Sequence, residues 1–273
     1  MRNIKLIISM GFVFLIGLAI LLYPTVSNMI NTLRNAERIA DYENFVSQIP
    51  DADYSEYFDA ADEYNQLLAN KLIGRGDESY NEILNLGASG MMGYLEIPKI
   101  KVRLPIYHGV DEKVLQIGVG HIEGTSLPVG GESTHSVLSG HRGLPSATLL
   151  TNLNRVVLGD EFYIYVLDEI LAYRVDDIRV VLPSQVDSLA IEKGKDYVTL
   201  VTCTPYGINS HRLLVRGTRT EYREADRERL VFDENANVID PNIISLIASA
   251  VILAIFFTIM IILRVRRNRK SRR

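Results

Sequence analysis

The sequence predicts a mainly β protein, an all-β barrel or sandwich with a few short helices, preceded by a helical extension and flanked by two membrane-spanning helices. Two apolar runs without a charge, residues 6–23 and 243–263, stand near the ends of the 273-residue chain. Between them the pattern is first helical and then, from Met91 onward, one of short strands separated by Gly, Pro and Asp. The segment between the spans, residues 24–241, is long enough for one sizeable core.

Each apolar run can cross a membrane as a helix, which takes about 18 or more apolar residues. The first run could instead be a cleaved signal peptide, but it is longer than a typical signal-peptide core and no A-x-A cleavage site follows it. We therefore expect residues 1–23 to be a cytoplasmic tail and an uncleaved anchor. Residues 223–241 are expected to be a linker, 242–263 a second transmembrane helix and 264–273 a basic cytoplasmic tail.

The charged residues orient the two spans. Of the 29 Lys and Arg, 2 precede the first span and 7 follow the second, and all 33 Asp and Glu lie between the spans. The middle segment therefore has 20 basic against 33 acidic residues, a formal charge of −13, whereas both tails are purely basic. The positive-inside rule then places both termini in the cytoplasm and residues 24–241 outside the cell. A basic tail can also bind nucleic acid, but directly after a span it is a topology signal, and no nucleic-acid partner is expected.

Residues 24–90 are expected to form the helical extension. From Asn28 to Leu86 apolar residues recur at helical intervals among charged ones, including Met29, Ile30, Leu33, Ile39, Leu67, Leu68 and Leu72. Such a segment forms a stalk or a layer laid on the following domain. The acidic run 51–62 is more simply a solvated helix face or loop than a metal site, and no cofactor or metal is expected.

Residues 91–222 are expected to form the β domain. Seven or eight candidate strands, rich in Val, Ile, Leu and Tyr, include GYLEIP, VRLPIYH, HSVLSGH, DEFYIYVL, ILAYRVDDIRVVLP, DYVTLVTC and RLLVRGTRTEY. Helical signal between them is limited to short pieces near residues 112–117 and 147–153. This spacing is typical of a barrel or sandwich.

Cys203 is the only cysteine of the chain. Outside the membrane it is a buried small hydrophobe, half of an intermolecular bridge, or a reactive thiol. The strand that ends at Cys203 is followed by a turn rich in Pro, Gly and Asn, and Arg212 begins the next strand. A hairpin-like connection therefore brings Cys203 and Arg212 side by side. This arginine is either a solvated strand end or a forked donor for an oxygen that becomes negative during acyl transfer.

A thiol nucleophile also needs a base or a cationic partner, and the chain has five histidines: His108, His121, His135, His141 and His211. His141 follows a strand in a Gly-flanked turn, SGHRGLP, where the backbone can present its imidazole to a cleft. His211 is the alternative. It precedes Arg212 on one strand, so the two side chains should point to opposite faces.

Together these segments resemble the class C sortases, cysteine transpeptidases that polymerise pilins on Gram-positive cell surfaces. The resemblance rests on TLVTCTPYGINSHRLLVRG with SGHRGLP upstream, and extends over residues 91–220 through MGYLEIPKI, LPIYHG, GVGHIEGTSLPVGG and THSVLSGHRGLPSA. Two anchors with both tails in the cytoplasm are also typical of class C. The resemblance implies an eight-stranded sortase β-barrel for residues 91–222.

The resemblance also implies roles for four residues. Cys203 matches the nucleophile, His141 the acid/base histidine, and Arg212 the arginine that stabilises the oxyanion and positions the sorting motif. Thr202 matches a position that lines the substrate groove. The implied reaction cleaves an LPxTG-like sorting motif of a pilin precursor through a thioacyl enzyme and joins the subunit to a lysine of the next one. Anchoring of surface proteins to peptidoglycan is the alternative enzyme function, and a two-span receptor or scaffold is the non-enzymatic one.

The sequence departs from the family in one segment. Many class C sortases carry before MGYLEIP a lid with an Asp-Pro-aromatic motif, in which the aspartate contacts the catalytic arginine and the ring covers the cysteine. Residues 51–90 contain no proline, so no such triplet exists. Tyr54, Tyr57 and Phe58 have helical spacing and are expected to pack against the barrel. The sequence therefore predicts a lidless or weakly lidded enzyme.

Overall fold

The computed structural model describes residues 2–49, 53–87 and 90–224, together with isolated residues between 249 and 260. Two compact units make up the chain, residues 1–27 with 235–273, and residues 28–234. In the first unit the ring centroids of Phe14 and Phe257 lie 4.7 Å apart. Most of the predicted second span, the linker from residue 225 onward and the basic tail lie outside the described residues.

A single long helix, α1 (Arg2–Ser47), carries both the first apolar run and the start of the extension. Among the described residues, the part Gly11–Ser47 of α1 is the helical segment that is long and apolar enough to cross a membrane. Its most apolar stretch of 18 residues has a mean hydropathy of 2.0, and none of this stretch is buried. This supports the predicted N-terminal anchor. The helix includes Pro24 and continues past it, so the anchor and the first part of the extension are one element.

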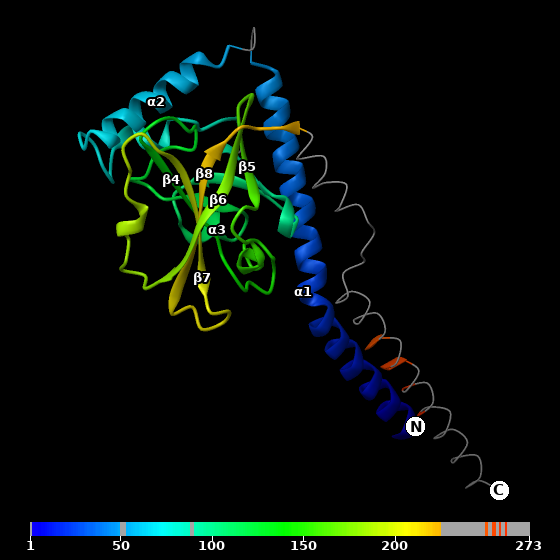
Figure 1. The fold of residues 1–273 in the computed structure, drawn as a ribbon. Coiled ribbons are helices and arrows are strands. Elements are labelled where there is room, and N and C mark those ends of the chain that lie inside the picture. Colours follow the sequence, from blue (N-terminus) through cyan, green and yellow to red (C-terminus); the bar gives the residue numbers. More distant parts are fainter. Residues whose placement is uncertain are drawn as a thin grey trace, which may run out of the picture. The chain divides into compact units, whose positions relative to one another are not determined.

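The β domain is a closed barrel in the order β1-β2-β3-β4-β7-β8-β6-β5 (Figure 1). Its strands are β1 (Met91–Ile97), β2 (Val102–His108), β3 (Val119–His121), β4 (Thr134–Ser139), β5 (Glu161–Val166), β6 (Glu169–Val181), β7 (Asp196–Thr204) and β8 (His211–Thr220). The pairs β2–β3 and β4–β7 are parallel and the other pairs are antiparallel. The eight-stranded barrel is confirmed, and its closure leaves no unpaired edge. Strand β3, with three residues, is the one that the sequence pattern did not predict.

Strand β1 is buried on both faces, because α1 covers the outside of the barrel there. Tyr42 of α1 lies 2% exposed, and its hydroxyl donates to the Met92 carbonyl at 3.3 Å and accepts from the Leu167 N–H at 2.8 Å. Gly93 is required in this strand, since a Cβ at that position would stand 2.2 Å from the Tyr165 carbonyl oxygen. The extension is therefore a packed layer on the barrel.

The second helix of the extension, α2 (Ser55–Ala69), lies at the end of the barrel opposite the β7–β8 turn (Figure 1). Asn65, 3% exposed, joins it to the barrel domain, because its side-chain amide donates to the Leu127 carbonyl at 3.2 Å and accepts from the Leu127 N–H at 2.7 Å. Ala61 and Tyr64 of the same helix are buried in the main core.

Two helical expectations are wrong in part. The helical pattern expected up to Leu86 ends at Ala69, and the segment after it consists of turns with one short 3-10 helix, η2 (Glu78–Asn81). Lys71 and Gly76 have positive φ values of 58° and 93°, which an α-helix cannot accommodate. The piece expected over residues 147–153 also consists of turns, followed by η4 (Leu153–Arg155), whereas α3 (Glu112–Leu115) lies within the piece expected over 112–117.

Candidate active site

The three residues Cys203, His141 and Arg212 meet at one end of the barrel, because β4, β7 and β8 are neighbouring strands. Cys203 is the Cα partner of Arg212 in the antiparallel β7–β8 pair, as the sequence predicted. In the parallel β4–β7 pair, Ser139 is the partner of Val201. His141 comes two residues after Ser139, in the turn that leaves β4 beside the end of β7 that carries Cys203. In the barrel order β7 lies between β4 and β8, so the strand of the cysteine lies between the elements that carry the histidine and the arginine.

Cys203 is a free, partly exposed thiol. Its neighbour Thr202 is only 1% exposed, and the Thr202 hydroxyl donates to the Gly140 carbonyl at 2.8 Å. Because successive side chains of a strand point to opposite faces, the buried position of Thr202 places the thiol on the outer face. A partly exposed thiol disagrees with the interpretation of Cys203 as a buried hydrophobe.

The turn that carries His141 is attached to the end of β7. The Gly140 N–H donates to the Val201 carbonyl at 3.0 Å, which extends the parallel ladder by one bond. The guanidinium of Arg142 donates to the Thr204 hydroxyl at 2.9 Å. These bonds, on either side of His141, hold the imidazole beside the strand end that carries the thiol.

Sequence reasoning missed one residue of this site, Glu112, the first residue of α3. Its Oε2 atom lies 3.3 Å from Nε2 of His141, and the exposed fractions of the two side chains are 65% and 26%. Hydrogen bonds from Gln116 and then from His141 lower the pKa of the Glu112 carboxyl. The two partners are 29 residues apart, so no local pattern indicates the contact.

Arg212 lies partly buried at the start of β8. Its Nη1 donates to the carbonyls of Asn209 and His211 at 3.2 and 3.1 Å, both in the turn that it closes. In the described part of the chain no carboxylate forms an ion pair with this guanidinium. Among the described residues, therefore, no carboxylate neutralises the positive charge of the residue paired with Cys203. His211 pairs with Thr204, and the next residue, Arg212, pairs with Cys203. Because successive side chains of a strand alternate, His211 and Arg212 point to opposite faces, as expected.

The other three histidines are fully or partly buried. His121 is fully buried, and burial lowers its pKa to about 4. His135 is 1% exposed and its Nε2 lies 2.8 Å from the Thr199 hydroxyl, while His108 Nε2 lies 2.8 Å from the Ile83 carbonyl. Burial lowers the pKa of both. These rings are neutral packing groups near pH 7.

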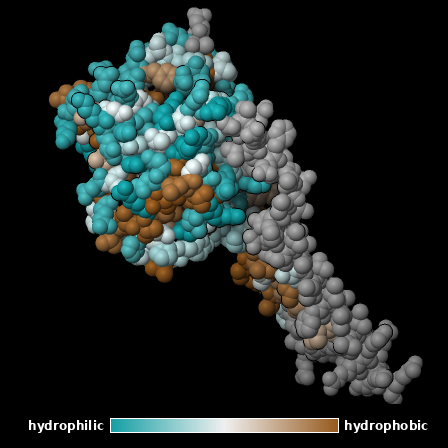
Figure 2. All heavy atoms as spheres, in the orientation of Figure 1, coloured by the Kyte–Doolittle hydropathy of each residue, from teal (hydrophilic) through white to brown (hydrophobic). Residues whose placement is uncertain are grey.

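Exposed apolar side chains surround the thiol end of the barrel. In β6, Val181 is the Cα partner of Arg212, and large exposed hydrophobic residues lie beside it in β6, in the β6–β7 loop and in the β7–β8 turn. Figure 2 shows apolar residues gathered on this face of the barrel. The exposed residues are Val180, Leu182, Val186, Tyr206 and Ile208.

The extension does not reach the thiol with polar contacts. Within residues 53–87, no hydrogen bond or ion pair of the described residues joins this segment to Cys203, His141 or Arg212. Tyr54, Tyr57 and Phe58 pack partly buried against the main core, as expected. These rings are therefore part of the packed layer.

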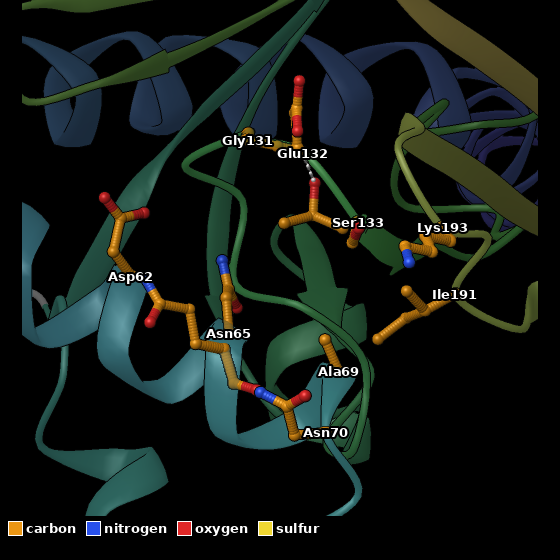
Figure 3. A pocket seen from close by; sticks show the side chains of 12 residues that line it. Asp62, Asn65, Ala69, Asn70, Gly131, Glu132, Ser133, Ile191 and Lys193 are labelled. Carbon is orange, nitrogen blue, oxygen red and sulfur yellow. Dashed lines mark hydrogen bonds between the residues drawn. The ribbon is translucent and has the colours of Figure 1, made fainter.

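A cavity of about 640 Å³ lies at the other end of the barrel (Figure 3). Side chains of α2 face the loop that precedes β4 across this cavity, and its lining includes Asp62, Gln66, Asn70, Glu132 and Lys193. It borders Thr134, the first residue of β4, whereas the His141 turn follows the last residue of the strand. Six residues of strand separate the two by about 20 Å, so the cavity is not part of the thiol site.

The comparisons with known proteins agree with this geometry. Residues 95–220 match the Sortase domain family model. Sortase C1 of Streptococcus agalactiae, a solved structure, is 47% identical with a TM-score of 0.65, and the match covers 68% of this chain and 100% of that chain. The chain belongs to the class C sortases. The sortase is therefore a cysteine transpeptidase by family, and the resemblance inferred from its motifs is confirmed.

Two further relatives extend the comparison. Sortase C of Clostridium perfringens, solved with the C-terminal cell wall sorting motif, is 44% identical with a TM-score of 0.63. The match covers 68% of the present chain and 100% of the Clostridium perfringens chain. Sortase D of Bacillus subtilis is 30% identical over 46% of this chain. The match spans 63% of the length of that curated relative. Identity is thus higher to these class C structures than to the class D enzyme.

Proposed function

We propose that this sortase polymerises pilins at the outer face of a Gram-positive cell membrane, with Cys203 as nucleophile, His141 as general acid and base, and Arg212 as oxyanion donor. Its substrates are pilin precursors with a C-terminal LPxTG-like sorting motif. The observation that supports the assignment is the strand register, which pairs Cys203 with Arg212 and brings the turn after β4, with His141, beside the end of β7. The N-terminal anchor within residues 1–23 and a second transmembrane helix at residues 242–263 hold the catalytic domain outside.

The chemistry is acyl transfer in two halves. The Cys203 thiolate attacks the threonine carbonyl of the motif, and the negative oxygen that forms accepts hydrogen bonds from the Arg212 guanidinium. The imidazolium of His141 then protonates the departing glycine amine, which leaves a thioester on Cys203. A lysine amine of the next pilin attacks this thioester after losing a proton to His141. An isopeptide bond forms, and the thiolate and imidazolium are restored.

The surroundings of the thiol suit this substrate. The exposed apolar residues of the β6–β7 loop and the β7–β8 turn offer contacts for a leucine and a proline. The guanidinium of Arg212 has a planar fork of donors and no carboxylate partner among the described side chains, so it can turn toward a carbonyl oxygen. Thr202 is buried, and the substrate-groove role that the resemblance implies for it remains a prediction.

Pilin polymerisation is preferred over attachment to peptidoglycan because the matched structures at 44–47% identity are class C enzymes. Access to the site is controlled without a lid of the Asp-Pro-aromatic type. The partly exposed thiol supports this proposal.

The experiment uses the full-length sortase in detergent with a pilin that ends in an LPxTG-like motif and a second, lysine-bearing pilin. We expect a covalent dimer, with the threonine–lysine isopeptide identified by mass spectrometry. Cys203→Ala should form neither thioester nor dimer, and Arg212→Lys should lose most activity because an ammonium lacks the guanidinium fork. His211→Ala is the matched control and should stay active. Normal turnover in Cys203→Ala would overturn the assignment, and coupling only to a peptidoglycan-type amine would favour the anchoring function.

A further inference from the structure

We propose that Glu112 is a positioning residue for His141. The short helix α3, and Asn28 and Asn31 of α1, hold this pair in place. The proposal rests on the proposed function, because it assigns His141 the proton transfers. Glu112 acts through the histidine and contacts neither Cys203 nor the substrate. It would complete a carboxylate–imidazole–thiol series across α3, the His141 turn and β7.

The carboxylate is held through both of its oxygens. Oε1 of Glu112 accepts from Nε2 of Gln116 at 3.1 Å, and Oε2 faces Nε2 of His141 at 3.3 Å. Glu112 and Gln116 stand four residues apart on one helical face, where side chains meet. A carboxylate with a donor at each oxygen has little freedom to rotate. It therefore orients the imidazole ring.

The short helix α3 is built to keep this geometry. The Asp111 side chain caps it by accepting from the Val114 N–H at 3.0 Å. The chain then enters β3, where Gly120 pairs with Ser139 of β4. Because Ser139 lies two residues before His141, the β3–β4 pairing places α3 beside the His141 turn.

The first turns of the extension contact both sides of this arrangement. The Asn31 side chain donates to the Gln116 carbonyl at 3.3 Å, and the Asn28 side chain accepts from the Thr148 N–H at 2.7 Å. Asn28 and Asn31 are three residues apart and share one face of α1. Thr148 belongs to the loop that follows His141. The helix α1 thus contacts, through Asn28 and Asn31, the two loops that flank the histidine.

The contact also assigns the two ring nitrogens. When Nε2 of His141 donates to Glu112, Nδ1 is the nitrogen left to exchange protons on the thiol side. The contact therefore leaves Nδ1 free to face the thiol while the carboxylate fixes the orientation of the ring. The neighbouring elements also carry Arg142 in the same turn, Cys203 on β7 and Arg212 on β8. Among the described residues, Glu112 is the acidic side chain that pairs with the His141 ring.

The test compares Glu112→Gln with the unmodified full-length sortase on an LPxTG peptide, across pH. We expect kcat to fall about three- to fivefold, the scale of an exposed ion pair, with KM unchanged within about twofold. The pH profile of kcat should also change, because the charge that faces the imidazole is lost. Gln116→Met, which removes the supporting amide without changing charge, should lower kcat less and leave the pH profile in place.

Controls separate this role from others. Glu63→Gln on α2 removes an exposed charge far from the thiol and should change nothing. Glu112→Asp keeps the charge but shortens the side chain by one methylene. Its kcat should lie between those of Glu112→Gln and the unmodified sortase. An unchanged kcat and pH profile in Glu112→Gln would overturn the proposal, and so would a rise in KM alone, which would mean substrate contact.

A readout without substrate keeps the inference independent of the proposed function. Alkylation of Cys203 by a small reagent is measured against pH in the unmodified chain and in Glu112→Gln. A displaced pH profile of labelling supports the Glu112–His141 coupling even if no sorting peptide is cleaved. Coincident labelling profiles would overturn the inference while leaving cleavage by Cys203 intact.

Discussion

Replacement of Thr202 by valine removes one hydroxyl next to the nucleophile with almost no change of shape. That hydroxyl is buried and donates to the carbonyl of Gly140, the residue before His141. The variant loses a hydrogen bond with a net value of about 1 kcal/mol, and it leaves a buried carbonyl without this donor, which costs about 1–3 kcal/mol. We expect the free energy of unfolding to fall by about 1–3 kcal/mol.

The same change should affect catalysis, because the Thr202–Gly140 bond holds the turn that presents His141. If about 1.4 kcal/mol of the expected loss falls on the positioning of this turn, kcat should fall about tenfold, with KM little changed. Unfolding in urea can be followed by tyrosine fluorescence, since the chain has 14 Tyr and no Trp. Turnover is measured on an LPxTG peptide.

Thr202→Ser is the matched control for this prediction. It keeps the hydroxyl and loses only a methyl group, so it should recover most of kcat and more of the stability than valine. The reasoning is refuted if Thr202→Val raises KM while kcat and stability stay unchanged. That outcome would support the substrate-groove role that the family resemblance implies.

Further predictions concern acid stability, the α1 contact, access to the thiol and topology. Burial lowers the pKa of His121 to about 4 from about 6.5 in the unfolded chain, so the unfolded state binds more protons between these values. Stability should therefore fall by about 3 kcal/mol as pH drops from 6.5 to 4, and His121→Gln should reduce that loss in urea titrations. Asn28→Ala removes the bond to the Thr148 N–H and should lower kcat severalfold with little change in the urea midpoint, whereas an unchanged kcat would contradict the coupling. Alkylation of Cys203 in the full chain should stay proportional to reagent concentration, since saturation would reveal an opening lid. A tag after Arg273 should resist protease added outside wall-stripped cells that cleaves within 24–241, and its digestion would exclude a second span.

Local patterns in the sequence predicted most of the fold. Seven of the eight strands follow from apolar and β-branched runs between turn residues, and the N-terminal anchor follows from an uncharged run. The pairing of Cys203 with Arg212 was also predictable, because a short turn between two strands sets their register. His141 was preferred for its strand-end turn and assigned through the family resemblance. β3 was missed since three residues, one of them glycine, carry too little pattern.

Tertiary structure alone decided how the site is assembled. The parallel pairing of β4 with β7 brings the turn of His141 beside the end of β7, although His141 and Cys203 are 62 positions apart, and nothing local to either segment specifies that register. The Glu112–His141 contact and the bond from Thr202 to Gly140 likewise join residues 29 and 62 positions apart. Periodicity and turn chemistry report which element a segment forms and which face it buries. Partners distant in sequence are chosen only when the barrel closes and its strand ends and loops come together.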